Sequence, residues 1–361
     1  MSIPQRSCFF RKAYLGLLAF LASACSNQAV PLPEEEEPFF FVQGADVSFL
    51  PELRYSGVIT RFQEQPEDPL LTLQRSGVNV IRLRLWKQPT EATSAFSTVK
   101  KLSSEVKNLG FKTLISVHYS DTWADPSKQT KPLDWKNTSG QPLQDSVYAY
   151  TRKIMEEIKP DFIQLGNEVN GGFLWPDGSY ANLSIFKSLL NKAALAVRQV
   201  NPKTKIILHY AGFEFAQSFF TRLSDIDYDI MGFSYYPIWH GKDLKKLQEG
   251  LTNLTATTQK PVLIAEMAYP FSLGWNDWTN NIVGLESQLL PDFPATPQGQ
   301  KEYVLAIKNL LKTNPKNIGF CYWGAEWVSF KGNRATNGSS WENQAFWDFN
   351  NNSLPVLEAY Q

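Results

Sequence analysis

Two glutamates stand directly after apolar, strand-like runs of the sequence. Glu168 follows the run 162–166 with Asn167 between them, and Glu266 follows the run 261–265. Retaining glycoside hydrolysis needs one protonated and one ionised carboxyl group about 5 Å apart. A single glutamate at such a position is more often a solvated loop carboxylate. Two of them, each among aromatic residues, favour a catalytic pair that converges across the mouth of one sheet.

The neighbours of the two glutamates indicate which one is ionised. Arg82 and Arg84 are two residues apart on a strand and therefore lie on the same side. Either arginine, together with a tyrosine hydroxyl, would keep Glu266 ionised as the nucleophile. Apolar neighbours such as Trp175 would raise the pKa of Glu168 and keep it protonated as the acid.

Polar and aromatic residues also gather where the other strands end. We interpret them as sugar-binding candidates because hydroxyl groups need hydrogen-bonding partners and the apolar faces of sugars stack on flat rings. The candidates are Asn167, Arg82, Arg84, Trp86, His118, Asp121, Trp123, Trp175, His209, Tyr236, Trp239, His240, Trp323 and Trp327. For His209 a purely structural role is an equal alternative.

Other chemistries fit the sequence less well. The three histidines show no HExxH spacing, so we prefer hydrogen-bonding roles to a zinc site. No GxSxG motif precedes a helix, which argues against a serine hydrolase. Oxygen ligands for calcium are present after the seventh strand, but a polar loop is favoured there; we expect no metal and no cofactor. These ligands are Asn276, Asp277, Asn280 and Asn281.

Eight strand-like runs alternate with amphipathic segments and must position these residues. The runs are 40–44, 79–85, 112–117, 162–166, 205–209, 228–233, 261–265 and 318–323. Apolar residues recur at helical spacing between them, for example at Val99, Leu102 and Val106. This alternation predicts a single (β/α)8 TIM barrel of class α/β, with its active site at the carboxyl ends of the strands. The longest loops, about 119–143 and 267–297, fall on that face.

The composition limits the partners of the chain. Its 361 residues are 43% hydrophobic, and 35 basic residues balance 35 acidic ones. A nucleic-acid binder would need a basic surplus, so nucleic acid is excluded as a partner. Aromatic residues make up 14% of the chain, including 11 Trp, which suits a surface that stacks against neutral sugar rings.

The first 39 residues are predicted to lie outside the barrel. Residues 1–24 have the basic start, short apolar run and small-residue end of a signal peptide, although an ordinary signal peptide with an incidental cysteine is the alternative. Cys25 is the predicted lipidation site, and 25–39 would form a flexible tether to the membrane. Cys8 would then be removed and Cys321 would have no partner, so no disulfide is expected. We expect an exported lipoprotein of the outer membrane, exposed at the cell surface, whose only membrane contact is the lipid.

Several longer runs carry a family resemblance. They are GADVS (44–48), HYSDTWADPSKQ (118–129), GNE (166–168), LWPDG (174–178), GFSYYPIWHG (232–241) and WENQAFWDFNNNSLP (341–355). The chain from residue 40 to 361 resembles glycoside hydrolase family 53, the arabinogalactan endo-β-1,4-galactanases. The resemblance implies a retaining barrel enzyme with Glu168 as acid/base and Glu266 as nucleophile. It also implies galactan and galacto-oligosaccharides as substrates.

The resemblance suggests roles for individual residues. Asn167 would bind the 2-hydroxyl of the sugar at the cleavage point, Tyr236 would orient Glu266, and Trp323 would form the floor under that sugar. One departure stands near strand eight. Where the family usually reads YWEPAW, this chain reads YWGAEW, so its carboxylate, Glu326, lies two places later.

We expect a monomer that hydrolyses β-1,4-galactan internally with retention of configuration. A related enzyme acting on another plant polysaccharide, such as mannan, is one alternative. A surface lipoprotein that binds glycan without cutting it is the other, although binding alone needs no carboxylate pair.

Overall fold

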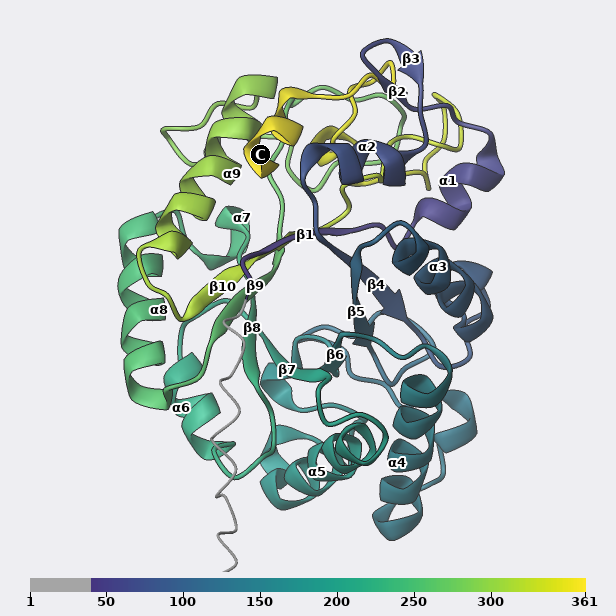
Figure 1. Cartoon of the computed structure of the whole chain (residues 1–361), viewed down its shortest axis with the longest axis vertical. Helices are drawn as coiled ribbons and strands as arrows, with labels where there is room; N and C mark the ends of the chain where they lie inside the picture. Colours follow the sequence, from purple (N-terminus) through teal and green to yellow (C-terminus); the bar gives the residue numbers. More distant parts are fainter. Residues whose placement is uncertain (1–39) are drawn as a thin grey trace, which may run out of the picture. The chain divides into compact units, whose positions relative to one another are not determined.

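Eight parallel strands close into a barrel (Figure 1) in residues 40–361, which are the residues that this computed structural model describes. The strands are β1 (Val42–Asp46), β4 (Val80–Leu85), β5 (Lys112–Val117), β6 (Phe162–Leu165), β7 (Lys205–Ala211), β8 (Ile230–Ser234), β9 (Val262–Met267) and β10 (Asn317–Tyr322). Each strand pairs with its neighbours in chain order, and β1 closes the ring by pairing in parallel with both β4 and β10. The predicted (β/α)8 barrel is therefore confirmed.

The strand boundaries differ from the predicted ones by at most two residues at each end. β5 spans 112–117 as predicted, whereas β1, β7 and β9 extend two residues further toward their carboxyl ends. The added residues include Asp46 and Tyr210, whose side chains are polar or aromatic but buried. Such residues are compatible with a strand when they are buried in the barrel. Polarity alone therefore placed the ends of these three strands too early.

Helices surround the barrel in Figure 1 and cover its outer face. They are α1 (Leu50–Ser56), α2 (Pro69–Ser76), α3 (Phe96–Asn108), α4 (Gly140–Glu157), α5 (Leu183–Val200), α6 (Ala216–Arg222), α7 (Pro237–His240), α8 (Leu244–Thr258) and α9 (Pro297–Lys312). The apolar stripes predicted from periodicity face inward: Val99, Leu102 and Val106 of α3 are all buried. Each helix thus packs one side against the strands and exposes the other.

Local signals start and stop several of these helices. The side chain of Asp68 accepts a hydrogen bond from the backbone N–H of Leu70, and Pro69 occupies the first turn of α2. Gly77 ends that helix with φ +98°, a conformation that costs glycine little. Asp243 caps α8 in the same way, accepting from the backbone of Lys245 and Lys246.

A small hairpin, β2 (Arg61–Phe62) and β3 (Gln65–Pro66), was not predicted. Its turn residues Gln63 and Glu64 both have positive φ, +49° and +64°. Turns of this kind usually contain Asn-Gly or Asp-Gly, so Gln-Glu provided no sequence signal.

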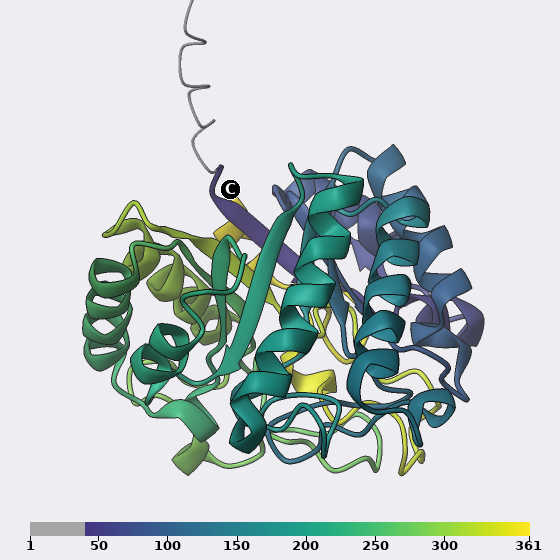
Figure 2. The same ribbon diagram turned by 90° about the horizontal axis from the view of Figure 1, so that it is seen from below.

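Long loops gather at the carboxyl ends of the strands, at the lower side of the molecule in Figure 2. The loop between β5 and α4 covers 118–139, and the loop between β9 and α9 covers 268–296, close to the predicted ranges. The segment after β10 is attached to the second of these loops, because the backbone N–H groups of Phe271 and Ile282 donate to the carbonyls of Asn343 and Ser340. Three chain segments therefore build the face on which barrel enzymes keep their active sites.

The predictions for residues 1–39, including the signal peptide, the lipidation of Cys25 and the tether, lie outside the described residues. Within residues 40–361, no helix has both the length and the apolar character needed to cross a membrane. Cys321 is a free cysteine buried in β10, where its sulfur packs against Gly44 of β1.

Candidate active site

Glu266, near the end of β9, is held by two donors. Arg82 Nη2 donates to its Oε1 across 2.6 Å, and the hydroxyl of Tyr236 donates to its Oε2 across 3.0 Å. Burial raises the pKa of Glu266, since only 7% of the residue is exposed, while Arg82 and the Tyr236 hydroxyl act in the opposite direction. Both oxygens are therefore oriented, and the charged form has a cation in direct contact.

Arg82 connects several strand ends beneath this carboxylate. Its Nη1 donates to Asp46 at the end of β1 across 2.7 Å, and its Nη2 also reaches Ser116 and Asn167. Burial opposes its charge, but Glu266 and Asp46 outweigh burial and raise its pKa. Arg82 is thus a permanently charged group that organises the centre of the site.

Glu168 follows β6 and has the opposite surroundings. Burial raises its pKa to about 8, and the nearby charge of Glu266 adds to the shift. Its Oε1 accepts a hydrogen bond from the Ser234 hydroxyl at 2.5 Å, which limits the rise. No salt bridge to Glu168 corresponds to the one that Arg82 makes to Glu266 within the described residues. Glu168 is therefore protonated at neutral pH.

His209, on β7, lies behind Ser234 and is completely buried. The backbone N–H of Glu168 can only donate, and it points to Nδ1 of His209 at 3.3 Å. Gln164 Nε2, a second donor, lies 2.9 Å from the same nitrogen. Asn167 Oδ1 also lies 3.1 Å from it but already accepts from Arg82 and Gln164, so we assign Nδ1 as the acceptor and place the proton on Nε2. Nε2 then donates to Ser234 across 2.9 Å, which directs the Ser234 hydroxyl proton toward Glu168. Burial lowers the pKa of His209 well below its usual value and keeps it neutral.

Asn167 is fixed by its neighbours in the strand ring. Its Oδ1 accepts from Arg82 Nη2 at 3.1 Å and Gln164 Nε2 at 3.0 Å, and its Nδ2 donates to the carbonyl of Ala124. An amide nitrogen carries two protons, so one remains for a further acceptor. Asn167 can therefore donate to a sugar hydroxyl next to Glu168.

Aromatic rings form a connected group beside the carboxylates. Trp123, 37% exposed, lies 6.1 Å from Trp323 and 5.3 Å from Trp86 between ring centroids. Trp323 in turn lies 4.7 Å from Trp341. Phe49 stacks on Trp327 at 3.7 Å and 11°. The predicted tryptophans of strands two, three and eight are therefore brought together.

Phe49, Trp341, Asp46 and Ser234 belong to the site but were not among the predicted site residues. Trp341 lies far from the strands in sequence, yet the segment after β10 returns it to Tyr236 at 5.7 Å between ring centroids. Asp46 and Trp341 fall within GADVS and WENQAFWDFNNNSLP, two of the runs that carried the family resemblance. Those runs were the signal that could have identified them.

Arg84 does not share the contacts of Arg82. Its Nε donates to Ser94 across 2.9 Å, and its guanidinium lies 4.0 Å from the ring centroid of Trp123 and 4.6 Å from that of Trp86. Burial lowers its pKa to about 10, which still leaves it charged at neutral pH. Arg84 therefore supports the aromatic group, while Arg82 serves the carboxylate.

His118 is neutral and has a defined tautomer. Its Nδ1 accepts from Trp86 Nε1 at 3.3 Å and from the backbone of Ala124 at 3.2 Å. Burial lowers its pKa well below the usual value. Nε2 consequently carries the proton and is the ring atom able to donate to a ligand.

Three other predicted residues have placements of different kinds. Both oxygens of Asp121 accept backbone N–H groups, from Gln88 and Leu133, so this carboxylate joins two loops. Trp175 packs on Gly171 and donates its Nε1 to the carbonyl there. Trp239 is 54% exposed at α7, beside His240.

Glu326, the displaced carboxylate near strand eight, is fully buried. Its Oε1 accepts the backbone N–H of Phe49 across 2.6 Å. Burial raises its pKa well above the usual value, which favours the protonated form. Glu326 thus fixes the loop after β1 that carries Phe49.

The polar loop after β9 is linked to the segment after β10. Asp277 Oδ1 accepts from the backbone of Thr279, and its Oδ2 accepts from the Ser329 hydroxyl at 2.9 Å. Glu342 Oε1 accepts from the backbone of Asn276 at 2.6 Å. Within residues 40–361, no three His, Cys, Asp or Glu side chains are grouped as a metal site would require.

Comparisons with known proteins agree with this geometry. The model of glycosyl hydrolase family 53 matches residues 42–360. An arabinogalactan endo-β-1,4-galactanase of Cellvibrio japonicus is 35% identical, over 96% of this chain and 96% of the relative. An endo-β-1,4-galactanase of Bacillus subtilis is 30% identical, over 89% and 85%.

A solved structure, the family 53 catalytic domain from Ignisphaera aggregans, superimposes with a TM-score of 0.85. It is 35% identical, and the match covers 91% of this chain and 98% of that domain. A fungal β-1,4-galactanase structure gives a TM-score of 0.78 at 26% identity.

Proposed function

The chain belongs to glycosyl hydrolase family 53, and we propose that it is an endo-acting enzyme that hydrolyses β-1,4-galactan with retention of configuration. The observation that carries the proposal is the different surroundings of two carboxyl groups at the ends of β6 and β9: Arg82 and Tyr236 donate to Glu266, whereas Ser234 donates to Glu168. Glu168 has a pKa of about 8, whereas Glu266 has Arg82 in contact. One group can therefore give a proton while the other attacks.

In the first step, a carboxylate oxygen of Glu266 attacks the anomeric carbon. The bond from this carbon to the glycosidic oxygen breaks, and the proton of Glu168 passes to that oxygen as the leaving chain departs. Tyr236 and Arg82 keep the attacking carboxylate oriented and charged until it forms the covalent bond. Asn167 donates to the 2-hydroxyl of the bound sugar.

In the second step, Glu168 is ionised and accepts a proton from water. The resulting hydroxide equivalent attacks the anomeric carbon, the bond to Glu266 breaks, and Glu168 is protonated again. The Ser234 hydroxyl stabilises the ionised form of Glu168 between the two steps. We propose that no metal or organic cofactor takes part, because these side chains supply every proton transfer and the nucleophile.

A substrate panel tests the proposal. Wild-type enzyme is incubated with β-1,4-galactan, mannan and xylan, and reducing ends are measured. We expect release from galactan, with galacto-oligosaccharides as products. Release from mannan alone would contradict the substrate assignment, and galactan retardation in an affinity gel without cleavage would indicate a binding protein.

The stereochemistry is tested by proton NMR of fresh products. Double displacement predicts that the β anomer appears first and then mutarotates. An α product formed first would contradict the two-step reaction, whatever the polysaccharide.

We also propose that the chain is an exported lipoprotein acylated at Cys25, exposed on the outer membrane, and monomeric. The support for export and lipidation is the sequence of residues 1–39, with its basic start, short apolar run and Ala-Ser-Ala before Cys25. Radiolabelled palmitate should label the wild type but not Cys25→Ser. An unlabelled wild-type chain would contradict lipidation, and a dimer mass in light scattering would contradict the monomer.

A further inference from the structure

A hollow of about 500 Å³ opens beside the site, at the ends of β7 and β8, and Phe215 and Trp239 are among the residues that line it. We propose that this hollow is a distal subsite for the polysaccharide on the leaving-group side of the cleavage point, with Phe215 as its stacking platform. The proposal rests on the proposed function for the identity of the sugar. Phe215, on which the proposal is centred, is not one of the two proposed catalytic residues.

Phe215 has no folding reason to be a phenylalanine. Its side chain is 80% exposed, so burial does not stabilise it. Its φ is +58°, in the left-handed region that bulky residues rarely adopt and that costs about 1–3 kcal/mol. Phe213, two residues earlier, instead packs against Gly250 of α8. An exposed ring held on an unfavourable backbone is accounted for by contact with a ligand.

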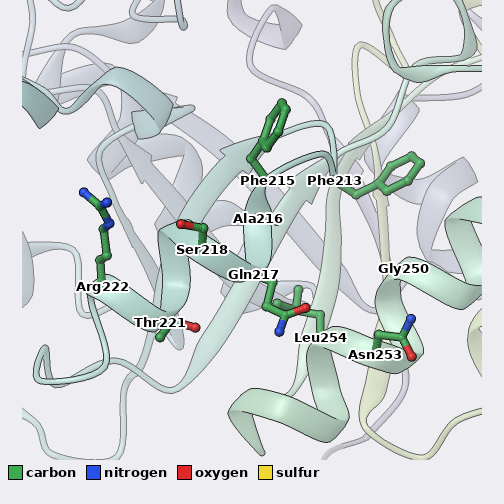
Figure 3. A pocket seen from close by; sticks show the side chains of 10 residues that line it. All are labelled: Phe213, Phe215, Ala216, Gln217, Ser218, Thr221, Arg222, Gly250, Asn253 and Leu254. Carbon is green, nitrogen blue, oxygen red and sulfur yellow. The ribbon is translucent and has the colours of Figure 1, made fainter.

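Figure 3 shows that the rings of Phe213 and Phe215 point in different directions. Phe215 projects away from α6, while the polar residues of that helix, such as Gln217 and Arg222, lie below it. A second hollow, of about 650 Å³, lies on this side between α6 and α8. Phe215 is part of the lining of both hollows, so its ring stands between them.

The hollow begins at the strand ends that hold the acid/base. Ser234 at the end of β8 donates to Glu168, and Gly212 after β7 donates its N–H to the Ser234 carbonyl. Asn170, two residues after Glu168, exchanges two hydrogen bonds with the backbone of Ala211. Because the acid protonates the departing oxygen, our proposal places the leaving chain next to Glu168, on the side of β7 and β8. The group of Trp123 and Trp323 lies by the ends of β5 and β10 instead.

The polar groups of the hollow suit a neutral sugar. His240 Nδ1 accepts the backbone N–H of Tyr236 at 3.0 Å, so Nε2 carries the ring proton. Burial lowers the pKa of His240 to about 4, which keeps it an uncharged donor at neutral pH. The charged lining residues are mixed in sign, namely Glu214, Lys242, Asp243 and Lys246. Stacking rings, a neutral donor and no excess charge are what a galactose residue would require.

The test uses Phe215→Ala, with Tyr55→Ala as the matched control. Tyr55 is 97% exposed on α1, so its removal also deletes an exposed ring. We expect kcat/KM of Phe215→Ala on long galactan to fall about fivefold, as the loss of one ring contact predicts. On an aryl β-1,4-galactobioside, which has no sugar on the leaving-group side of the cleaved bond, kcat/KM should stay within about twofold of wild type. Equal effects on both substrates would overturn the proposal.

The position of cleavage tests independently whether the hollow lies on the leaving-group side of the cleaved bond. A galactoheptaose labelled with ¹⁸O at its reducing end is digested, and products are identified by mass spectrometry. Loss of a distal leaving-group subsite should move cleavage toward the reducing end, because binding modes that fill this subsite are weakened. An unchanged pattern, or a shift toward the non-reducing end, would overturn the assignment. Gln217→Ala, in the second hollow, should leave the pattern unchanged; a shift equal to that of Phe215→Ala would overturn Phe215 as the platform.

Failure of the proposed function is distinguishable from failure of this inference. If the wild type cleaves mannan and not galactan, the function fails. The same comparison with labelled mannoheptaose then still decides whether Phe215 forms a leaving-group subsite. If the wild type cleaves galactan and Phe215→Ala behaves like Tyr55→Ala, the function stands and the subsite does not.

Discussion

Arg82 Nη2 donates to Oε1 of Glu266 across 2.6 Å, and this contact favours the charged form of Glu266 over that of Glu168, the other proposed catalytic carboxyl group. Burial raises the pKa of both glutamates, but only Glu266 has this arginine in contact. The contact also crosses the barrel, from β4 to β9. The fold therefore supplies the difference in protonation that double displacement requires.

Arg82→Lys should weaken this difference. Lysine keeps the charge but cannot serve Asp46 and Glu266 at once with a planar fork. The pKa of Glu266 should rise, so the acidic limb of the kcat/KM profile should move to higher pH, and kcat should fall by roughly 100-fold. Arg75→Lys, an exposed substitution, is the control. An acidic limb identical to that of wild type would contradict the role of Arg82.

Ser234→Ala should instead change the alkaline limb of the pH profile of kcat/KM. The hydroxyl donates to the ionised form of Glu168 and lowers its pKa, so its removal should raise that pKa above about 8. Activity should then persist to higher pH, while kcat near neutral pH falls. Ser103→Ala, which removes a buried hydroxyl without a hydrogen-bond partner, should leave the pH profile unchanged. A downward shift of the alkaline limb in Ser234→Ala would refute the hydrogen-bond assignment.

Glu326→Gln should change how stability depends on pH. The folded state raises the pKa of Glu326, so its contribution to stability is full below the unfolded-state pKa and is lost as pH rises through the folded-state pKa. Glutamine stays neutral and can still accept from the backbone of Phe49. The Tm of the variant relative to wild type should therefore increase from pH 5 to pH 9. A Tm difference that is constant with pH, or that reverses, would show that Glu326 is ionised in the folded protein.

Trp123→Ala should reduce binding more than stability. The ring is 37% exposed beside Trp323, so its removal should lower kcat/KM on galactan by roughly tenfold, with a change in Tm of a few degrees at most. Kinetics and thermal unfolding measure the two effects. A variant with wild-type kcat/KM would exclude Trp123 from the sugar-binding surface.

The sequence predicts the barrel well because period and alternation are local properties. The buried stripe of Val99, Leu102 and Val106 is an example. Glu168 and Glu266 could be named as candidates because each stands at or just after the end of an apolar strand-like run, where the chain direction alone determines the face on which it lies. The role of His209 behind Ser234 was not, because it depends on hydrogen bonds between strands that are distant in sequence.

Trp341 and Phe49 show the same limit. Trp341 is brought to Tyr236 by the irregular segment after β10, which has no periodicity to interpret. Phe49 is held by Glu326, 277 residues away in the chain. Such contacts arise from packing between loops, and no local pattern in the sequence encodes them.

Trapping a covalent intermediate between Glu266 and the sugar is the most direct test of the proposed reaction. The enzyme is incubated with a 2-deoxy-2-fluoro-β-galactobioside that carries an activated leaving group, then digested and analysed by mass spectrometry. Double displacement predicts one added galactobiosyl group on the peptide that contains Glu266, and none in Glu266→Ala. A label on Glu168 or Glu326, or turnover without any covalent species, would contradict it.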